Sequence, residues 1–319
     1  MTETTAIGPR LEGEATRVRA PKVSVLMPVY NAERYVAEAT RSILDQTFGD
    51  FEFLIIDDGS TDGSRAILER FAAEDPRIRL ISRPNTGYLV ALNQMLALAE
   101  GELLARMDAD DVARSDRFER QVRYLGENPD CVLVGSRVTV IDPDGRPLTV
   151  MSRALSHEEI IGGLLTGEGG QLVYHPSVMF RKWAVDEVGP YREEFYLCED
   201  VEFFLRMAEV GRIVNLPETL VRYREHFTKV GRARVAQQLV ATRRAIVEAN
   251  LRRGLTPPAP PPDREARPFG RAEILRCWGW WALGSGFVGT ARHYALAAVA
   301  CSPHSRDSWR LLACAVRGR

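Results

Sequence analysis

The chain has 319 residues, of which 45% are hydrophobic and 27% are charged, and its 42 Lys and Arg nearly balance its 43 Asp and Glu. This is the composition of an ordinary globular protein with room for one large α/β domain and an appendage. The five cysteines are odd in number, scattered and without a CxxC motif, which excludes a disulfide framework and structural zinc and indicates a reducing compartment. No window offers a signal-peptide core or the ~20 apolar residues of a spanning helix.

Charge is divided unevenly along the chain. Residues 227–319 carry 16 Lys and Arg against 5 Asp and Glu, whereas residues 1–226 carry 26 against 38. A basic tail on an acidic body indicates either an anionic partner, such as phospholipid headgroups or a lipid diphosphate, or an arginine-rich helical surface in solvent. We therefore expect a cytoplasmic protein, with peripheral contact to the inner face of the membrane left open, and no nucleic acid partner.

Strands and helices alternate through the first hundred residues, after an expected disordered leader at residues 1–20. Buried strands are predicted at residues 23–30, 51–56, 78–82 and 102–107. Helices are predicted between them at residues 33–47, 64–74 and 87–99. Four such alternations indicate a parallel sheet with right-handed crossovers, and such sheets bind ligands at the carboxyl ends of their strands.

The next hundred residues depart from this repeat. Capping boxes at Asp116 with Glu119 and at Ser156 with Glu159 predict two helix starts. The turn at 142–145 predicts a hairpin after a long strand. The strands are predicted at residues 131–141 and 171–180, and a further helix at residues 200–210.

The C-terminal region is predicted to be helical. A basic helix is expected within residues 227–254, followed by a stiff Pro-rich linker at 255–270 and a helical region at 271–319. The three short helices of that region are predicted at residues 271–284, 287–301 and 305–316. Trp278, Trp280 and Trp281 fit either an interfacial membrane anchor or the core of a helical hairpin packed on the main domain.

Carboxylates gather after two of the predicted strands. Asp57 and Asp58 follow the second strand, and Asp108, Asp110 and Asp111 follow the fourth. Such crowded acids repel one another unless a cation or a polar ligand lies among them. We interpret the Asp108-x-Asp110 pattern as a divalent-metal site that holds the phosphates of a nucleotide. No GxGxxG or P-loop motif is present, which argues against a dinucleotide enzyme or an NTPase.

Five separated motifs resemble the inverting family-2 glycosyltransferases of bacterial type, which have the GT-A fold. In chain order they are residues 23–31, 56–62, 85–87 with Asn93, 107–111 and 199–200. The resemblance covers residues 22–226 and implies a Rossmann-like mixed sheet flanked by helices, with a small C-terminal helical appendage. It divides a glycosyltransferase domain at 21–226 into a nucleotide-binding half, 21–111, and an acceptor half, 112–226.

The resemblance implies roles for residues on the nucleotide side. Asp58 matches a carboxylate that accepts a hydrogen bond from the base, and Tyr30 and Pro28 match the wall beside that base. Asp57 ranks behind Asp58 because it could instead cap the loop that follows. Uracil and thymine both offer an imide N–H, so the resemblance favours a UDP or dTDP donor.

Asp108 and Asp110 match the metal motif of the family, and their oxygen ligands suit Mn²⁺ or Mg²⁺. We expect Asp110 on the metal, Asp108 beside the ribose or a coordinated water, and Asp111 behind them. His226 matches a metal-ligating histidine of some relatives, although it could equally be a polar surface residue. Arg106 could pair with phosphate or with a neighbouring carboxylate.

Glu199 and Asp200 open a predicted helix, where carboxylates are favoured by the helix dipole alone. Within the resemblance, Asp200 matches the general base that takes the proton from the acceptor hydroxyl, and Glu199 could contact the acceptor. A single displacement inverts the anomeric carbon and requires no covalent nucleophile. His175 is interpreted as structural.

The sequence thus predicts an inverting, metal-dependent glycosyltransferase of the hexosyltransferase type. It would move a sugar from a nucleotide-diphosphate donor to a saccharide or lipid-linked acceptor in cell-envelope or exopolysaccharide synthesis. A nucleotidyltransferase is disfavoured because residues 28–33 lack a Gly-rich basic loop, and the retention of Asp110 and Asp200 argues against an inactive sugar-nucleotide binding module. Removal of residues 255–319 is expected to leave a folded, donor-binding domain.

Overall fold

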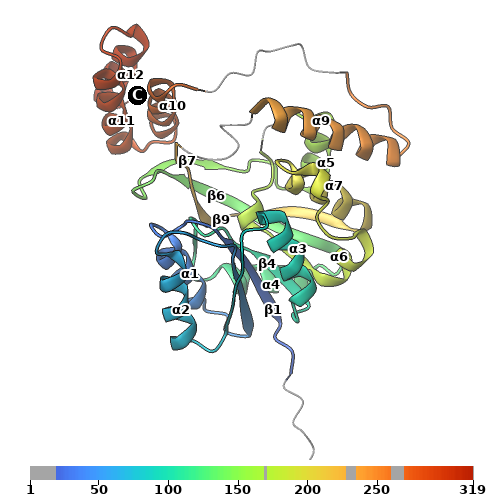
Figure 1. Cartoon of the computed structure of the whole chain (residues 1–319). Coiled ribbons are helices and arrows are strands. Elements are labelled where there is room, and N and C mark those ends of the chain that lie inside the picture. Colours follow the sequence, from blue (N-terminus) through green and yellow to red (C-terminus); the bar gives the residue numbers. More distant parts are fainter. Residues whose placement is uncertain (1–18, 169–170, 228–234, 260–268, 319) are drawn as a thin grey trace, which may run out of the picture.

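A mixed β-sheet crosses the molecule and carries helices on both faces (Figure 1). The computed structural model describes residues 19–168, 171–227, 235–259 and 269–318. The strands are β1 Val23–Val29, β2 Phe51–Asp57, β3 Ile78–Ser82, β4 Leu103–Arg106, β5 Val112–Ala113, β6 Cys131–Ile141, β7 Pro147–Met151, β8 Met179–Arg181 and β9 Arg212–Arg224. The α-helices are α1 Val36–Leu44, α2 Ser64–Glu74, α3 Tyr88–Leu98, α4 Arg117–Glu127, α5 His157–Thr166, α6 Lys182–Val188, α7 Glu199–Val210, α9 Val235–Arg252, α10 Arg271–Gly284, α11 Val288–Cys301 and α12 Arg306–Arg317.

The strand order is β3-β2-β1-β4-β8-β6-β9-β5, with β7 beside β6. The first four strands run parallel, as predicted, so the ends of β1, β2 and β4 meet at one edge. β8 runs antiparallel to both β4 and β6, and β9 runs parallel to β6. The predicted mixed sheet is confirmed, and the switch in direction at β8 separates the regular half from the irregular one.

Two apolar cores cover the two faces of the sheet. Along β1, Val23, Val25, Met27 and Val29 pack with α1, α2 and α4, whereas Leu26 packs with α3 and α7. This alternation is the period of two that a strand imposes on its side chains. Burial on both faces explains why the strand reads as one continuous apolar run.

Strand β9 was not foreseen from the sequence. Pro217 and Glu218 interrupt its apolar pattern, and the pairing of β6 with β9 shifts register between Ser136 and Val138. Proline lacks the N–H that a regular ladder requires, so the irregularity hides a long strand. The two-residue β5, which pairs with β9, was also missed.

The strand predicted at residues 171–180 is mostly wrong. A short 3₁₀ turn occupies His175–Ser177, and only β8 follows it as a strand. Pro176 sits inside that turn, and Ser177 N–H donates to the Tyr174 carbonyl at 2.8 Å instead of to a neighbouring strand. Residues 169–170 lie outside the described part of the chain.

One of the two predicted capping boxes forms. Ser156 Oγ accepts from Glu159 N–H, and Glu159 Oε2 accepts from Ser156 N–H at 3.1 Å. The box at Asp116 is wrong, because the Asp116 carboxylate accepts from Arg114 and Arg120 and makes no cap hydrogen bond. Two strong cations compete successfully for that carboxylate.

The helices α10, α11 and α12 stand beside β7 and are joined to the sheet by a shared core (Figure 1). Trp278 is fully buried with Val138 and Val140 of β6, and its ring lies 5.2 Å from that of Tyr294. The interpretation of Trp278 as a core residue is confirmed; Trp281 is half-buried, and of these three tryptophans Trp280 alone is exposed, at 37%. Among the described helices, none is long and apolar enough to cross a membrane.

Some predicted segments fall partly or wholly outside the described residues. These are the leader at 1–20, the start of the basic helix and the middle of the linker at 255–270. The basic helix itself is present as α9. The division into a nucleotide-binding half, an acceptor half and an appendage stays a prediction.

Candidate functional site

A pocket of about 480 Å³ opens at the carboxyl ends of β1 and β4. Five predicted site residues line it, namely Pro28, Tyr30, Asp108, Asp110 and His226. Its remaining walls come from the segment 31–35, Ala109, Pro143 and Phe227. Asp57, Asp58, Glu199 and Asp200 are not among the lining residues.

The acidic cluster follows β4 directly. One carboxylate oxygen from each of Asp108, Asp110 and Asp111 lies within 4.8 Å of the others. Arg106, which is 1% exposed, donates from Nη2 to Asp108 Oδ1 at 2.6 Å. Of the two roles left open for Arg106, the structure shows the pairing with a carboxylate. This buried cation offsets part of the repulsion among the acids.

The end of β9 brings His226 to the same cluster. His226 Nε2 lies 3.1 Å from Asp110 Oδ2, although the two residues are 116 positions apart in sequence. Carboxylate oxygens are ligands for both Mn²⁺ and Mg²⁺, and an imidazole nitrogen is a further ligand that suits Mn²⁺. The three carboxylates therefore fit the metal site that the sequence predicted, and His226 contacts one of them. A ligand role for His226 stays a prediction.

Arg224 is a site residue that the sequence analysis missed. Its buried guanidinium donates from Nε to the Asp110 carbonyl at 2.7 Å and from Nη2 to Glu38 Oε2 at 2.7 Å. Its backbone N–H donates to Asp111 Oδ1 at 2.7 Å, and Nη1 donates to the carbonyls of Asp142 and Pro143. Arg224 therefore fixes the acidic cluster to α1 and to the β6–β7 turn. No local sequence pattern marks it, because its partners come from three distant segments.

Asp58 is 2% exposed and is engaged within the protein. Its Oδ1 accepts from Arg83 Nε at 2.8 Å and from Thr86 N–H, and its Oδ2 accepts from Gly87 N–H at 2.9 Å. The motif at residues 85–87 is thus held against the end of β2. Gly59 has a φ of 78°, and a Cβ there would lie 2.6 Å from Asn85 N, so only glycine fits this approach.

Asp57 makes the loop contact that the sequence analysis considered. Its Oδ1 accepts from Ser60 N–H at 3.1 Å, and its side chain is buried. Such a carboxylate satisfies the backbone of the turn after a strand. Its ranking behind Asp58 as a nucleotide contact stays a prediction.

Glu199 and Asp200 form the first turn of α7. Tyr88 at the start of α3 donates its hydroxyl to Glu199 Oε1, while Glu199 Oε2 is buried without a hydrogen-bond partner among the described residues. Asp200 Oδ1 accepts from Val201 N–H at 2.8 Å. Tyr88 was missed from the sequence, where it appears as an ordinary helical aromatic residue.

The pKa values of both carboxyl groups are raised. For Glu199 the causes are burial and then the charge of Asp200. For Asp200 burial is again the largest cause, and the Asp108 carboxylate adds to it, while Arg106 acts in the opposite direction. A carboxylate with a raised pKa is a stronger base than an exposed one, as a proton acceptor requires.

His175 and Asn93 hold the structure around Tyr191. His175 Nε2 lies 2.7 Å from Tyr191 Oη, and burial lowers the pKa of His175 well below its usual value. Asn93 Nδ2 donates to the Tyr191 carbonyl, and Tyr191 N–H donates to Asn93 Oδ1, both at 2.9 Å. These contacts agree with a structural role for His175.

The family model of glycosyl transferase family 2 matches residues 24–189, which is more than half of the chain. The chain belongs to glycosyltransferase family 2. This family-2 glycosyltransferase is 32% identical over 222 residues to an uncharacterized glycosyltransferase of Haemophilus influenzae, a match that spans 65% of this chain and 66% of that protein. It is 35% identical over 210 residues to EpsE of Bacillus subtilis, a protein assigned to the glycosyltransferases, over 64% of this chain and 73% of EpsE.

Solved structures share the GT-A fold with this family-2 glycosyltransferase. A mannosyltransferase of Pyrobaculum calidifontis, solved with GDP-mannose and Mn²⁺, superposes with a TM-score of 0.54 at 20% identity, over 94% of this chain and 81% of that one. Residues 1–349 of TarS from S. aureus, solved with UDP-GlcNAc, superpose with a TM-score of 0.54 at 17% identity, over 93% and 92%. At such identities the likeness concerns the fold.

Proposed function

We propose that this glycosyltransferase transfers a sugar, with inversion at the anomeric carbon, from a nucleoside-diphosphate donor to an acceptor hydroxyl. The observation that carries the proposal is the single pocket in which Asp108, Asp110 and His226 meet Pro28 and Tyr30. Acidic and imidazole ligands beside a flat aromatic wall suit a diphosphate and a nucleobase, respectively. Tyr30 is 52% exposed and so has a free ring surface for the base.

Asp110 and His226, with Asp108, would hold Mn²⁺ or Mg²⁺, and the ion when bound would neutralise the diphosphate as it leaves. Arg106 fixes the orientation of the Asp108 carboxylate through its 2.6 Å hydrogen bond. Arg224 fixes the backbone at Asp110. The chain thereby preorganises its carboxylates before the donor arrives.

On the acceptor side, Asp200 takes the proton from the attacking hydroxyl. Glu199 holds that hydroxyl through Oε2, which has no partner among the described residues, while Tyr88 fixes Oε1. One displacement on the sugar inverts the anomeric carbon, and no covalent nucleophile is needed. Loss of the Asp200 carboxylate should therefore abolish transfer without abolishing donor binding.

A UDP or dTDP donor is favoured within this proposal. Asp58 Oδ2 accepts from Gly87 N–H, and a carboxylate oxygen has capacity for a further donor such as the imide N–H of uracil or thymine. The two structural neighbours were solved with UDP-GlcNAc and with GDP-mannose, so a guanine nucleotide is the alternative to test. The acceptor is proposed to be a saccharide or lipid-linked saccharide of the cell envelope, on the cytoplasmic side. The support is a likeness of 34% identity over 151 residues to TuaG of Bacillus subtilis, which is named for teichuronic acid biosynthesis.

The test is a panel of UDP-, dTDP- and GDP-sugars with Mn²⁺, scored by thermal shift and by slow donor hydrolysis. We expect a shift and hydrolysis with a UDP- or dTDP-sugar, and the loss of both when EDTA removes the metal. Hydrolysis separates an enzyme from an inactive binding module. A response to GDP-sugars alone would overturn the donor assignment, and a response independent of divalent metal would overturn the metal site.

A matched pair of variants tests the base. Asp200→Asn should lose turnover by at least about a thousandfold and keep the donor-induced thermal shift. Asp186→Asn, at an exposed acid of α6, should retain both. If Asp200→Asn also lost donor binding, Asp200 would be a helix cap instead of a base.

A further inference from the structure

The described arginines of the C-terminal region fall into two groups. One group is used inside the protein: for example, Arg252 and Arg253 pair with Glu209, Arg244 pairs with Glu248, and Arg292 donates to the Ala315 and Val316 carbonyls. By contrast, the three arginines of α12 are exposed, and no hydrogen bond or ion pair joins them to a described residue. They are Arg306, Arg310 and Arg317.

These arginines lie on one side of α12. At 3.6 residues per turn, positions 306, 310 and 317 fall along one line of the helix. Trp309 and Val316, which are 52% and 61% exposed, fall along the adjoining line. We call these five residues the α12 face.

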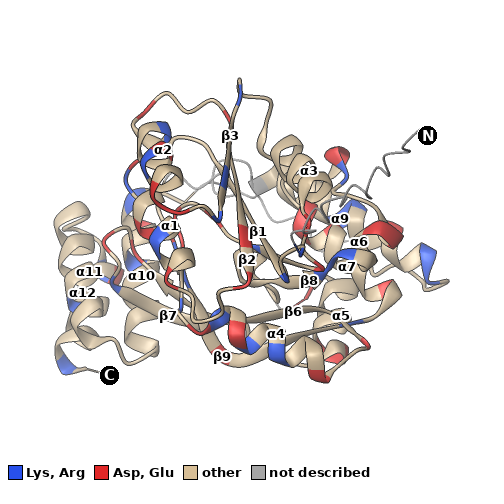
Figure 2. Ribbon diagram, turned by 90° about the horizontal axis from the view of Figure 1, so that it is seen from below, with Lys and Arg blue, Asp and Glu red and all other residues tan. Residues whose placement is uncertain are grey.

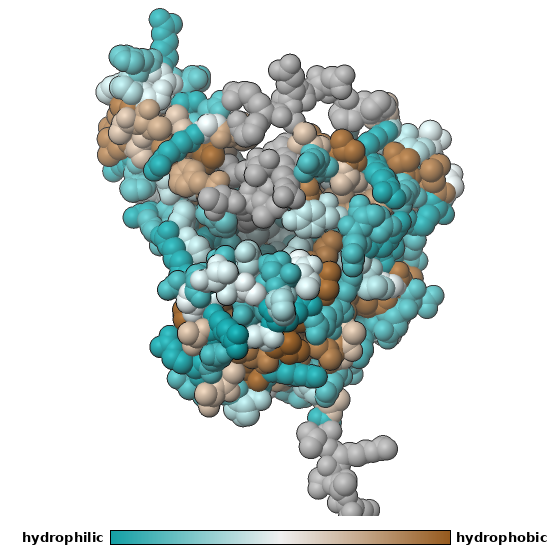
Figure 3. Space-filling view, viewed as in Figure 1, coloured by the Kyte–Doolittle hydropathy of each residue, from teal (hydrophilic) through white to brown (hydrophobic). Residues whose placement is uncertain are grey.

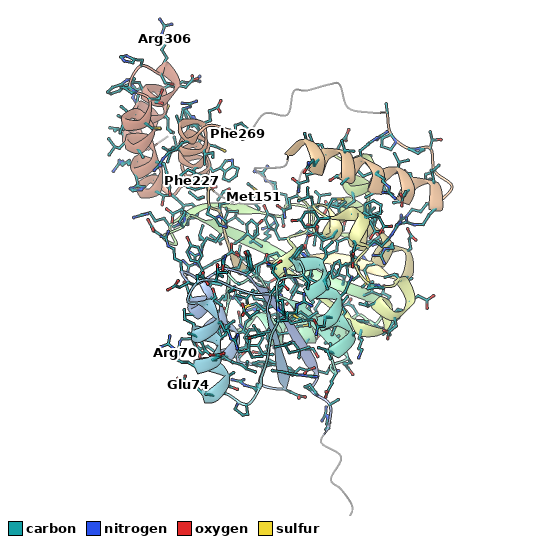
Figure 4. The ribbon with its side chains drawn as sticks, viewed as in Figure 1. Arg70, Glu74, Met151, Phe227, Phe269 and Arg306 are labelled. Atoms are coloured by element: carbon teal, nitrogen blue, oxygen red, sulfur yellow. The ribbon has the colours of Figure 1, made fainter. Side chains whose placement is uncertain are left out.

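The opposite side of α12 fixes the orientation of the α12 face. Leu311 and Ala315 are buried against Ala282, Ala291 and Ala295 of α10 and α11. The helix is capped at its start by Ser305 and at its end by Arg292. The α12 face is therefore turned away from α10 and α11. Figure 1 shows α12 at the edge of the molecule, remote from α2, and Figure 4 shows Arg306 at that edge.

The chemistry of the α12 face suits the surface of a bilayer. Trp309 Nε1 donates to the Pro303 carbonyl at 2.8 Å, so the indole ring can enter an apolar layer without losing a hydrogen bond. Three arginines beside a tryptophan and a valine match anionic headgroups above an acyl boundary. Figure 2 shows Lys and Arg residues on the C-terminal helices at the outer side of the molecule, and Figure 3 shows apolar residues exposed on the same helices.

We propose that the α12 face binds the surface of an anionic phospholipid membrane. A protein partner fits the face less well, because five residues on one helix cover far less than the ~800 Å² per partner of a stable protein interface. The proposal concerns an interaction surface away from the pocket and stands independently of the donor and the acceptor. The sequence analysis suggested an anionic partner for the basic residues 227–319 as a whole, and this proposal assigns the contact to α12.

The experiment is co-sedimentation of the full chain with vesicles of phosphatidylglycerol and phosphatidylcholine, compared with vesicles of phosphatidylcholine alone. We expect binding to the anionic vesicles only, weakened by added salt. Each arginine near the surface contributes roughly a fivefold factor, so R306Q/R310Q/R317Q should weaken binding by about a hundredfold. Trp309→Ser should weaken it about tenfold through lost apolar burial.

Arg70→Gln, which removes an exposed arginine of α2, is the matched control and should bind vesicles as the unaltered chain does. All variants should keep the donor hydrolysis of the unaltered chain, because the α12 face is remote from the pocket. The arginine variants should also keep its thermal unfolding midpoint, because the side chains that they replace are exposed and unpaired among the described residues. Equal binding to both vesicle types, no binding to either, or unaltered binding by the triple variant would each overturn the proposal. A drop in oligomeric mass in the triple variant would show instead that the face contacts a second copy of the chain.

Discussion

The two acidic residues at the start of α7 lower the stability of the folded protein when they are ionised, and their raised pKa values suit a proton acceptor. Glu199 and Asp200 are adjacent, largely buried, and close enough to Asp108 for its charge to raise the pKa of Asp200. Both carboxyl groups therefore hold protons more tightly in the folded protein than in the unfolded chain. Between the unfolded and folded pKa values the folded state binds more protons, so stability falls as pH rises through that interval.

Asp200→Asn should accordingly stabilise the metal-free protein while abolishing transfer. We expect a gain of about 1–3 kcal/mol in the free energy of unfolding at pH 8, where the full penalty of the charge is present, and a much smaller gain near pH 4.5. Urea unfolding at the two pH values in EDTA measures it, with Asp186→Asn as the control that should change neither value. A destabilised Asp200→Asn at pH 8 would mean that the helix cap outweighs the repulsion.

With Asp200 as the proposed base, its raised pKa should also set the acid limb of the pH–activity profile. The base must be ionised to accept a proton, so kcat should fall as the pH drops below the pKa of Asp200, at a higher pH than for an ordinary aspartate. A pH profile of kcat with saturating donor and Mn²⁺ measures this limb. A limb near pH 4 would show that the bound donor and metal cancel the effect of burial.

The hydrogen bonds of Arg224 require the planar shape of its guanidinium as well as its charge. Its side chain donates to the Asp110 carbonyl, to Glu38 and to the β6–β7 turn at once, which a lysine ammonium cannot reproduce. Arg224→Lys should lower the free energy of unfolding by about 2–4 kcal/mol and weaken Mn²⁺-dependent donor binding. Urea unfolding and a Mn²⁺ titration of the donor-induced thermal shift test both effects.

Arg222→Lys provides the comparison on the same strand. Arg222 is exposed; its Nη1 lies 3.8 Å from Glu38 Oε1, and its Nη2 donates to the Gly145 carbonyl at 2.9 Å. Solvent competes for both contacts, so the stability should change little. Equal free energies of unfolding for the two lysine variants would mean that the multiple hydrogen bonds of Arg224 add no stability beyond that of its charge.

At the scale of elements, the C-terminal helices contact the walls of the pocket. Tyr294 of α11 donates its hydroxyl to Asp142 Oδ2 at 2.6 Å, and Asp142 begins the turn whose Pro143 lines the pocket. Phe227, labelled in Figure 4, also lines the pocket. Its ring packs at a tilt against that of Trp278 of α10, with centroids 4.8 Å apart. The appendage therefore supports one side of the site.

Tyr294→Phe should destabilise the protein by about 1–3 kcal/mol, because the buried Asp142 carboxylate loses a hydrogen bond. Thermal unfolding measures the change. Tyr124→Phe is the control, since no described residue accepts from or donates to the Tyr124 hydroxyl. Equal effects of the two variants would mean that the bond to Asp142 contributes nothing specific.

Removal of the C-terminal helices has a different expected outcome from the one drawn from sequence. Truncation before residue 269 would expose Val138, Val140, Leu148 and Val221, which now pack with Trp278. We expect the truncated chain to unfold at a markedly lower temperature and to bind a hydrophobic dye, because the cost of exposing such a surface is several kcal/mol. If the truncated chain were as stable as the full chain, the C-terminal helices would be an independent appendage, as expected from the sequence.

At the scale of the whole molecule, ion pairs join the acidic body to one helix of the basic tail. Arg252 and Arg253 of α9 pair with Glu209 of α7, and Arg192 of the body pairs with Glu248 of α9. These pairs lie between elements that are remote in sequence. The number of charges in each part of the chain can be counted from the sequence. Whether the arginines of α9 pair within the protein depends on the packing of α9 against α7, which the sequence does not show.

The sequence by itself determined the regular half of the fold and the chemistry of its strand ends. Local patterns sufficed there, because apolar runs with helical stretches between them dictate parallel β1 to β4, and Asp108 and Asp110 follow a strand directly. The missed elements have irregular local patterns, such as β9 with Pro217 and the 3₁₀ turn at Pro176.

Only the tertiary structure decided which distant groups complete the site. His226 reaches Asp110 across 116 positions, Arg224 joins the acidic cluster to Glu38, and Tyr88 takes one oxygen of Glu199. These contacts depend on long-range pairing of β9 with β6 and on helices packing across the sheet. A sequence read residue by residue contains no period or spacing that encodes them, because each depends on the placement of a whole element.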